Sequence, residues 1–274
     1  MRYQTLSRYS DTDFKRLVGV PRSHFQEMVQ VLDEAEQLKK KSGRPHTLSM
    51  EDQLLLTLNY LRHYNTQLEL SASYAIAESN VNRTIHKVEN ALMRSRKFTL
   101  PKRQQRTDEN HFNWVIIDAT ETPIERPQKN NETGYSGKKK RHTLKTQIIY
   151  HPHSQQILSV RIDNDHTHDI SIAKKTMQDL CHYGYVMADL GYYGLKEVEF
   201  KLLTPLKKSK NIALSKEEKE FNRKLSKYRI KIEHINGQLK RFRILSECYR
   251  NRRKRFGLRV NLIAALVNRM NLLP

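Results

Sequence analysis

The spacing of apolar residues changes once along this chain, near residue 110, and this change constrains the fold more than any other feature. Before it, apolar side chains recur every three or four positions, as in amphipathic helices. After it, short runs such as residues 114–117 are apolar at consecutive positions, which indicates buried strands. The 274 residues are enough for two modest domains. We therefore expect an all-α domain over residues 1–98 and an α/β domain over residues 99–274.

The helical part ends in a pattern typical of a DNA-reading module. A first helix stops before a linker at residues 39–45, where lysines precede a Gly and a Pro. A helix over residues 50–64 and a shorter element over 68–75 follow, and Ser79 is expected to cap the helix after them. Two helices, a tight turn and a final amphipathic helix predict a helix-turn-helix.

The outward face of that final helix carries Asn80, Arg83, His86 and Lys87. Such side chains reach base edges and phosphates when a helix enters the major groove. The alternative is a helical hairpin whose polar face is only solvated. The net charge of +21, from 50 Lys and Arg against 29 Asp and Glu, favours DNA, because basic side chains neutralise phosphates and release counterions.

An acidic membrane surface is the competing partner for so basic a chain. No apolar run approaches the roughly 20 residues of a membrane span, and the most apolar stretch, residues 258–273, is interrupted by Arg259 and Asn268. The N-terminus lacks the apolar block of a signal peptide. We expect a cytoplasmic, nucleoid-associated protein, with Cys181 and Cys248 as core residues.

The second part reads as alternating strands and helices. Three strands, a helix, a fourth and a fifth strand and closing helices are expected in that order. This order describes a ribonuclease H-like sheet, so the fold class is α/β with an N-terminal all-α domain. The expected strands cover residues 114–118, 144–150, 156–162, 185–189 and 200–204, and the helices cover residues 170–180, a long segment after 215, and 256–272. The long helix has an apolar stripe of Phe221, Leu225, Tyr228, Ile232, Ile235, Leu239 and Phe242.

Asp118 and Asp189 end two of the apolar strands, at the sheet edge where open α/β sheets bind ligands. Glu233 lies one position off the apolar stripe of the long helix. It belongs to a polar stripe that also contains Arg229, Asn236 and Lys240. Together the three acids could hold two Mg²⁺ ions, with Mn²⁺ as a substitute, for in-line displacement at phosphorus. Taken singly, each acid has another reading: a strand-end turn residue for either Asp, and a lysine-paired surface carboxylate for Glu233.

Two further segments are rich in chemically active side chains. The loop over residues 135–141 includes Lys138, Lys139 and Lys140, which we assign to DNA backbone contact, the alternative being a solvated hairpin tip. Residues 165–169 read Asp-His-Thr-His-Asp. Their two histidines are too close in sequence for a helical pair and no Cys is near, so we do not expect zinc there.

Four motifs carry a resemblance to a known family. They are IDATETPIERP at 117–127, YSGKKKRHT at 135–143, ADLGY at 188–192 and the spacing Arg229-x3-Glu233-x6-Lys240. The ordered series resembles the signatures of bacterial insertion-sequence DDE transposases, the group related to eukaryotic PIF/Harbinger elements, over nearly the whole chain. The resemblance implies that Asp118, Asp189 and Glu233 are the metal-binding catalytic triad, that Arg229 and Lys240 are accessory basic residues that contact DNA, and that residues 46–92 hold the family's helix-turn-helix.

The activity implied is Mg²⁺-dependent transposition. The protein would bind the terminal inverted repeats of its own element, cut there, and join the freed 3′-hydroxyl to target DNA, as a homodimer or larger assembly on DNA. Two alternatives stay open: a non-catalytic helix-turn-helix regulator, which binds without nicking, and a domesticated nuclease, which cuts but does not join ends.

Overall fold

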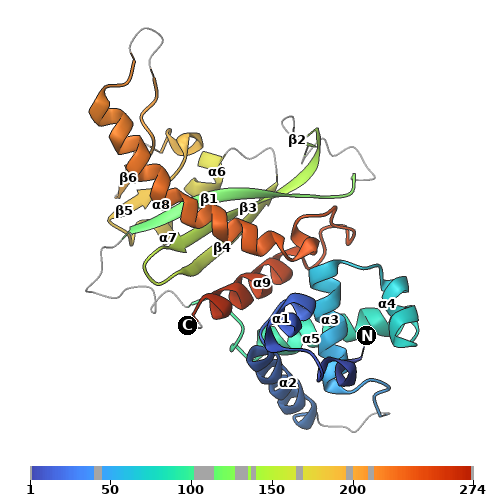
Figure 1. Cartoon of the computed structure of the whole chain (residues 1–274). Helices are drawn as coiled ribbons and strands as arrows, with labels where there is room; N and C mark the ends of the chain where they lie inside the picture. Colours follow the sequence, from blue (N-terminus) through green and yellow to red (C-terminus); the bar gives the residue numbers. More distant parts are fainter. Residues whose placement is uncertain are drawn as a thin grey trace. The chain divides into compact units, whose positions relative to one another are not determined.

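The computed structural model describes residues 2–39, 45–101, 114–126, 135–136, 140–164, 169–195, 200–208 and 213–272, with the backbone alone at 135–136, 164 and 169 (Figure 1). Two compact units are present. The helical unit comprises Met1–Thr99, Lys240–Glu247 and Arg255–Leu273. The α/β unit comprises Leu100–Leu239 and Cys248–Lys254. The first segment thus ends beside the boundary expected at 98/99, whereas two closing segments expected in the α/β domain group with the helical unit.

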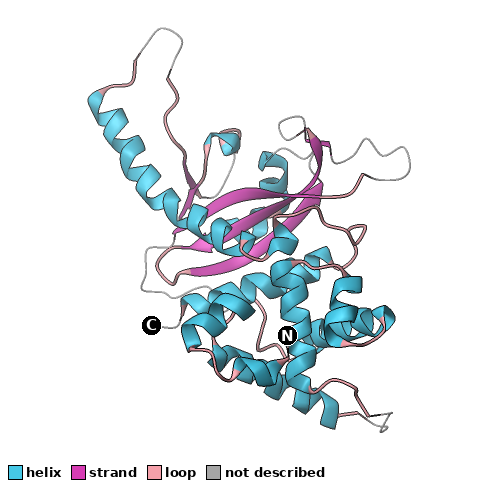
Figure 2. Ribbon diagram, turned by 45° about the vertical axis from the view of Figure 1, so that its right-hand side comes forward, coloured by secondary structure: helices cyan, strands magenta, loops and turns pink. Residues whose placement is uncertain are grey.

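Eight of the described helices and short helical turns belong to the helical unit, six before residue 100 and two after residue 240; they are drawn as ribbons in Figure 2. They are η1 (Tyr3–Leu6), α1 (Asp11–Val18), α2 (Arg22–Gln37), α3 (Met50–His63), α4 (Gln67–Tyr74), α5 (Glu78–Arg94), η4 (Arg243–Leu245) and α9 (Phe256–Asn271).

The expected helix-turn-helix is confirmed as α4, a short turn and α5. Thr66 and Glu69 form a capping box at the start of α4, in which the side chain of each residue accepts a hydrogen bond from the backbone N–H of the other. Ala75 ends α4 in the left-handed conformation at φ 50°. The expectation that Ser79 caps the next helix is wrong, because α5 begins at Glu78 after Ala77, which makes no side-chain cap.

A buried ion cluster joins α5 to α9. Glu89 is 0% exposed and accepts hydrogen bonds from Arg255 Nε at 2.7 Å and Arg259 Nε at 2.6 Å. Burying a carboxylate is costly unless it is paired and hydrogen-bonded, and here two guanidinium groups supply both. This contact explains why α9 belongs to the helical unit, although Arg259 lies 170 residues after Glu89. Apolar spacing alone does not reveal such a pairing.

The α/β unit is built on a mixed sheet, as expected for a ribonuclease H-like fold, with six strands among the residues that the structure describes. Its main order is β4-β3-β1-β5-β6, and the short β2 also pairs with β3. The β1–β3 and β3–β4 pairs are antiparallel, and the β1–β5 and β5–β6 pairs are parallel. The strands are β1 (Trp114–Pro123), β2 (Tyr135–Ser136), β3 (Arg141–His151), β4 (Gln156–Asn164), β5 (Tyr185–Met187) and β6 (Lys201–Leu203).

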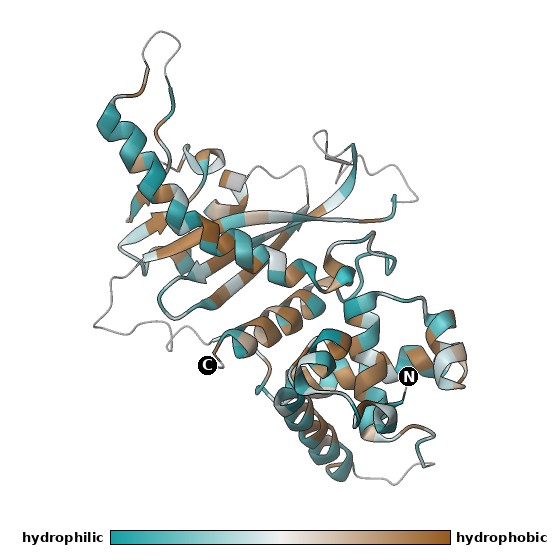
Figure 3. Ribbon diagram, viewed as in Figure 1, coloured by the Kyte–Doolittle hydropathy of each residue, from teal (hydrophilic) through white to brown (hydrophobic). Residues whose placement is uncertain are grey.

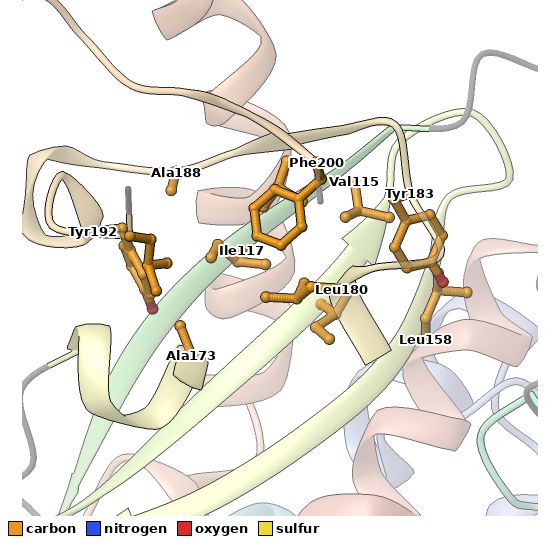
Figure 4. Close-up of a cluster of buried hydrophobic side chains, with 12 residues drawn as sticks. Val115, Ile117, Leu158, Ala173, Leu180, Tyr183, Ala188, Tyr192 and Phe200 are labelled. Carbon is orange, nitrogen blue, oxygen red and sulfur yellow. The ribbon is translucent and has the colours of Figure 1, made fainter. Parts of the chain in front are cut away.

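One face of this sheet is the apolar core of the unit. Val115 and Ile117 of β1, together with Val186 and Ala188 on the β5 side, pack beneath α6 (Asp169–Lys175) and α7 (Met177–Leu180) (Figure 4). Side chains alternate between the faces of a strand, so Ile116 and Asp118 belong to the opposite face.

The long helix α8 (Lys216–Lys240) lies on that opposite face (Figure 1). The Tyr228 ring meets the Trp114 ring edge-on at 5.4 Å between centroids, and Asn236 reaches Asp118. The expected apolar stripe is only partly buried: Leu225, Ile232, Ile235 and Leu239 are buried, whereas Phe221 and Tyr228 are 38% and 47% exposed. The N-terminal half of the helix extends past the strands and is largely hydrophilic (Figure 3).

The structure also bears on the expectations for the cysteines, the two histidines and a membrane span. Both cysteines were expected in the core. Cys181 is only half-buried and Cys248 is exposed, so the expectation is wrong for Cys248 and is not met in full by Cys181. Residues 165–168, with the two histidines, lie outside the described residues. Within the described ranges, no helix combines the length and apolarity needed to cross a bilayer.

Candidate catalytic site

The sheet register brings Asp118 and Asp189 to neighbouring positions. Ile116 of β1 pairs with Met187 of the parallel strand β5. Each aspartate lies two residues beyond one member of this pair, so both continue the same face of the sheet, on strands about 4.8 Å apart. Asp189 keeps an extended backbone, with φ −82° and ψ 179°, just after β5. The strand-end position expected for Asp118 is wrong, because β1 continues to Pro123. The two aspartates are nevertheless neighbours in space at the backbone level.

Both aspartates are held by neutral hydrogen-bond donors. Asn236 Nδ2 donates to Asp118 Oδ2 at 2.8 Å, a bond that spans 118 residues of sequence. The backbone N–H of Gly191 donates to Asp189 Oδ1 at 2.9 Å, so Asp189 caps the short turn η3 (Leu190–Tyr192). Both side chains are half-buried. The turn role weighed for Asp189 is thus present, and it leaves the second carboxylate oxygen outside this bond.

Helix α8 and strand β1 contact each other at two points, and the distance between these points is nearly the same along the helix and along the strand. From Tyr228 to Asn236 the helix rises about 12 Å, at about 1.5 Å per residue. From Trp114 to Asp118 the strand rises about 13 Å, at about 3.3 Å per residue. Glu233 lies between these two points of contact, about 60° further around the helix than Asn236. Its side chain is exposed, at the edge of α8 rather than beneath it.

The three carboxylates do not form a closed ligand set as they stand. Within the described ranges, no group of three or more His, Cys, Asp or Glu side chains is placed to hold a metal ion. The donor chemistry nevertheless fits Mg²⁺ or Mn²⁺, because these hard cations take carboxylate oxygens and Mg²⁺ retains several waters. Asn236 Oδ1 is buried and accepts no hydrogen bond from the described residues. Such an acceptor beside Asp118 suits a hydrated cation, whose waters donate.

The face of α5 that was expected to contact DNA divides into two parts. Asn80 and Arg83 are exposed, as that role requires. Lys87 instead makes an ion pair with Glu36 at 2.7 Å and donates to Gln53 Oε1 at 3.1 Å. Its expected position on a free outward face is therefore wrong, because the ammonium group is half-buried among partners of its own unit.

His86 is also half-buried rather than outward-facing. Burial, followed by the nearby Arg255, lowers the pKa of its imidazole and favours the neutral form. Glu36, the partner of Lys87, shows the reverse balance. Burial opposes its ionisation, but hydrogen bonds from Lys39, Lys87 and His46 outweigh that effect and lower the pKa of Glu36 to about 2.

The other residues expected to contact DNA differ in exposure, and two of them are not described by the structure. Lys138 and Lys139 are outside the described residues. Lys140 is exposed, with φ 50°, directly before β3. On α8, Arg229 is half-buried and Lys240 is exposed at the last position. Their roles stay predictions.

Asn236 received no role from the sequence, although it shares the polar stripe of Glu233. Its spacing of three positions from Glu233 placed it on the same flank of the helix, which was the available signal. Nothing in the sequence links it to Asp118, because the register between α8 and β1 is set by tertiary packing.

Comparisons with known proteins identify the family of this chain. Residues 112–268 match the family of the transposase DDE domain, and residues 46–98 match the helix-turn-helix of DDE superfamily endonucleases. The chain belongs to the DDE transposase family. It is 42% identical over 269 residues to a probable transposase for insertion sequence element IS702 from Microchaete diplosiphon, and the match covers 98% of each protein. The helix-turn-helix match spans α3, α4 and α5, and the DDE match begins just before β1.

Proposed function

We propose that this DDE transposase binds the inverted repeats at the ends of its element, cuts them in a Mg²⁺-dependent reaction and joins the freed ends to target DNA. The observation that carries the proposal is the shared face of Asp118 and Asp189 on paired parallel strands, with α8 bonded to the same face through Asn236. The family membership supports nucleic acid chemistry, and the narrower relationship to PIF/Harbinger elements stays a prediction.

Asp118, Asp189 and Glu233 would hold the divalent cations. When bound, two such ions supply Lewis acidity to the attacking and leaving oxygens of a displacement at phosphorus. Asn236 keeps the Asp118 carboxylate oriented from the helix side. Glu233 is exposed on a long, flexible side chain and would complete the ligand set when DNA is bound.

The reaction would consist of two successive displacements at phosphorus. Water first attacks the phosphodiester at the repeat end and leaves a 3′-hydroxyl. That hydroxyl next attacks a phosphodiester of the target in the same geometry and displaces the target's own 3′-oxygen, which leaves as a hydroxyl. No covalent link to protein is needed. Asn80 and Arg83 at the start of α5 would read the repeat in the major groove. Because two ends must be brought together, we propose a homodimer or larger assembly on DNA.

The test uses full-length protein and duplexes that carry the element's ends. We expect Asp118→Asn, Asp189→Asn and Glu233→Gln each to lose Mg²⁺-dependent cleavage by at least about a thousandfold, since the cations contribute several kcal/mol to the transition state. These near-isosteric changes retain shape and hydrogen-bonding capacity. Wild-type rates in any of the three would contradict the assignment of that residue.

Pre-cut ends separate the alternatives. A transposase converts them to strand-transfer product with target DNA. Cleavage without joining would identify a nuclease, and binding of end DNA without nicking would identify a regulator.

A further inference from the structure

The last residues of β1 lie between two basic segments of the α/β unit. On one side, the Ile124 N–H donates to the His142 carbonyl at 2.9 Å, next to Arg141. On the other side, the Tyr249 N–H donates to the Pro123 carbonyl at 2.8 Å, and Tyr249 forms a parallel bridge with Ile124. Adjacent residues of a strand direct their hydrogen-bonding groups to opposite edges, so both edges of β1 are covered at this point.

Tyr249 also fixes the segment that follows it. Its ring is 0% exposed, and its hydroxyl donates to the Lys254 carbonyl at 2.5 Å. The Lys254 N–H donates to the Asn251 carbonyl at 2.9 Å, which closes the loop. Arg252 and Arg253 have φ values of 46° and 64°. L-residues adopt this left-handed conformation only where the surroundings impose it, so the loop has a defined shape.

This loop presents positive charge at alternate positions. Arg250, Arg252 and Lys254 are exposed, and Arg253 is half-buried. We call residues 250–254 the basic loop. On the other side of β1, Lys140 and Arg141 are exposed as well.

The two basic segments are neighbours electrostatically. The pKa of the Cys248 thiol is raised, first by burial and then by Glu125, and Arg141 and Arg250 oppose this increase. All of these groups therefore lie within electrostatic reach of one exposed thiol. Glu125 is the acid in residues 124–126, 140–142 and 249–254, so the surface is basic despite it.

The position of this surface relative to Asp118 fits a duplex. From Asp118 to Pro123 the strand rises about 17 Å, at about 3.3 Å per residue. Base pairs are stacked about 3.4 Å apart, so a duplex lying along β1 would cover this span with about five base pairs. Arginine forks suit phosphate oxygens, and fixed donors bind them with little ordering cost.

We propose that the basic loop, together with Lys140 and Arg141, binds the DNA backbone about five base pairs from the phosphodiester placed at Asp118. This inference rests on the proposed function for its substrate, and it adds a DNA-binding segment at the carboxyl end of β1. An acidic polypeptide is the other polyanion that such a surface could take.

The test measures binding alone, in the Asp118→Asn background and without divalent cation, so it does not depend on cleavage. The variant Arg250→Gln/Arg252→Gln/Lys254→Gln removes three exposed charges. We expect the slope of log K against log salt to become shallower by about 2.7, at about 0.9 per phosphate contact. The matched control Lys216→Gln/Lys219→Gln/Lys227→Gln removes three exposed charges from α8, and its slope should change by less than about 1.

A second readout keeps the test decisive if the loop variant folds poorly. In a Cys181→Ala protein with an intact loop, bound duplex should slow maleimide modification of Cys248 at least about tenfold, and high salt should abolish that protection. Equal slope changes in the two charge variants, or full reactivity of Cys248 in a saturated complex, would overturn the proposal. So would a loop variant that loses binding to poly-glutamate but not to DNA. Failure of cleavage alone would count against the proposed function and leave this surface standing.

Discussion

Glu89 in the helical unit and Asp118 in the α/β unit are both acids held by residues distant in sequence, but their surroundings differ in kind. Glu89 is 0% exposed and bonded to the guanidinium groups of Arg255 and Arg259. Asp118 is half-buried and bonded to the neutral amide of Asn236. The two arginines neutralise Glu89 inside a core and so hold the fold together, whereas the amide of Asn236 orients the Asp118 carboxylate without itself neutralising it. The comparison thus separates structural acids from acids suited to chemistry.

The largest expected effect on stability comes from the first kind. Glu89→Ala should lower the free energy of unfolding by about 3–5 kcal/mol, because it leaves two buried or half-buried guanidinium groups without their carboxylate. Asp118→Ala should change it by less than about 1 kcal/mol. Urea denaturation followed by circular dichroism gives both values.

A paired substitution checks the cause. Glu89→Leu/Arg259→Leu removes the buried guanidinium of Arg259 together with its carboxylate, and only the half-buried Arg255 keeps a charge that has lost Glu89. Part of the lost stability should therefore return. Similar losses for Glu89→Ala and Asp118→Ala would break the distinction between the two acids.

The next largest effect is expected from Asn236, the neutral donor that bonds to Asp118. Asn236→Leu removes the hydrogen bond to Asp118 and should reduce the cleavage rate about 10- to 100-fold, the usual cost of losing a group that orients a metal ligand. Part of the loss should be recovered at higher Mn²⁺ concentration. Cleavage of end DNA over a range of Mn²⁺ concentrations measures both effects.

The control lies on the same helix. Asn222→Leu removes hydrogen bonds to the Leu206 backbone, at 2.8 and 3.1 Å, and should leave the cation dependence unchanged. If both variants shifted the Mn²⁺ requirement equally, helix packing rather than Asp118 would be the cause.

On α5 the same distinction applies to basic residues. Arg83→Ala should weaken DNA binding and reduce its salt slope by about 1, with little change in stability. Lys87→Ala should cost about 1 kcal/mol of stability, because its ammonium bonds to Glu36 and Gln53, and should change the salt slope less. Fluorescence anisotropy at several salt concentrations, with parallel denaturation, distinguishes them. The reverse pattern would mean that α5 presents a different face to DNA.

The smallest expected effect concerns Glu36, an acid of intermediate exposure beside two lysines and a histidine. Its pKa of about 2 lies below the ordinary value of 4.5, so the folded state favours the ionised form. Its contribution to stability is therefore complete above about pH 4.5 and is lost as the pH falls from 4.5 towards 2. The contribution should be below about 1 kcal/mol, since partly exposed pairs are screened.

Glu36→Gln isolates this contribution. The difference in unfolding free energy between wild type and variant should shrink between pH 5 and pH 3, while the other carboxylates titrate equally in both. A difference that grows on acidification would reverse the assigned sign.

The sequence predicted what is encoded locally. The short apolar runs before Asp118 and Asp189 predicted strands β1 and β5, although β1 continues past Asp118 to Pro123. The helix-turn-helix follows from period and turn chemistry. Their expected convergence at one sheet edge agrees with the parallel register of β1 and β5. The expectations for Lys87 and Cys248 failed, because their environments are created by segments remote in sequence, such as Glu36 for Lys87.

The long helix shows the same limit in another form. An apolar stripe predicts which side of a helix packs, but not where the partner surface ends. Leu225 and Ile232 are therefore buried as expected, whereas Phe221 and Tyr228 remain exposed. The register that places Asn236 at Asp118 is likewise a property of packing and not of either segment alone.

The central claim is that Asp118, Asp189 and Glu233 close around divalent cations when DNA is bound. Crystals of the full chain with cleaved end DNA and Mn²⁺, measured by anomalous diffraction, test it directly. We expect two anomalous peaks about 3.5–4 Å apart, with Asp118, Asp189 and Glu233 oxygens as their protein ligands. Peaks bound by other residues, or an ordered complex in which Glu233 stays out of coordinating reach, would contradict it.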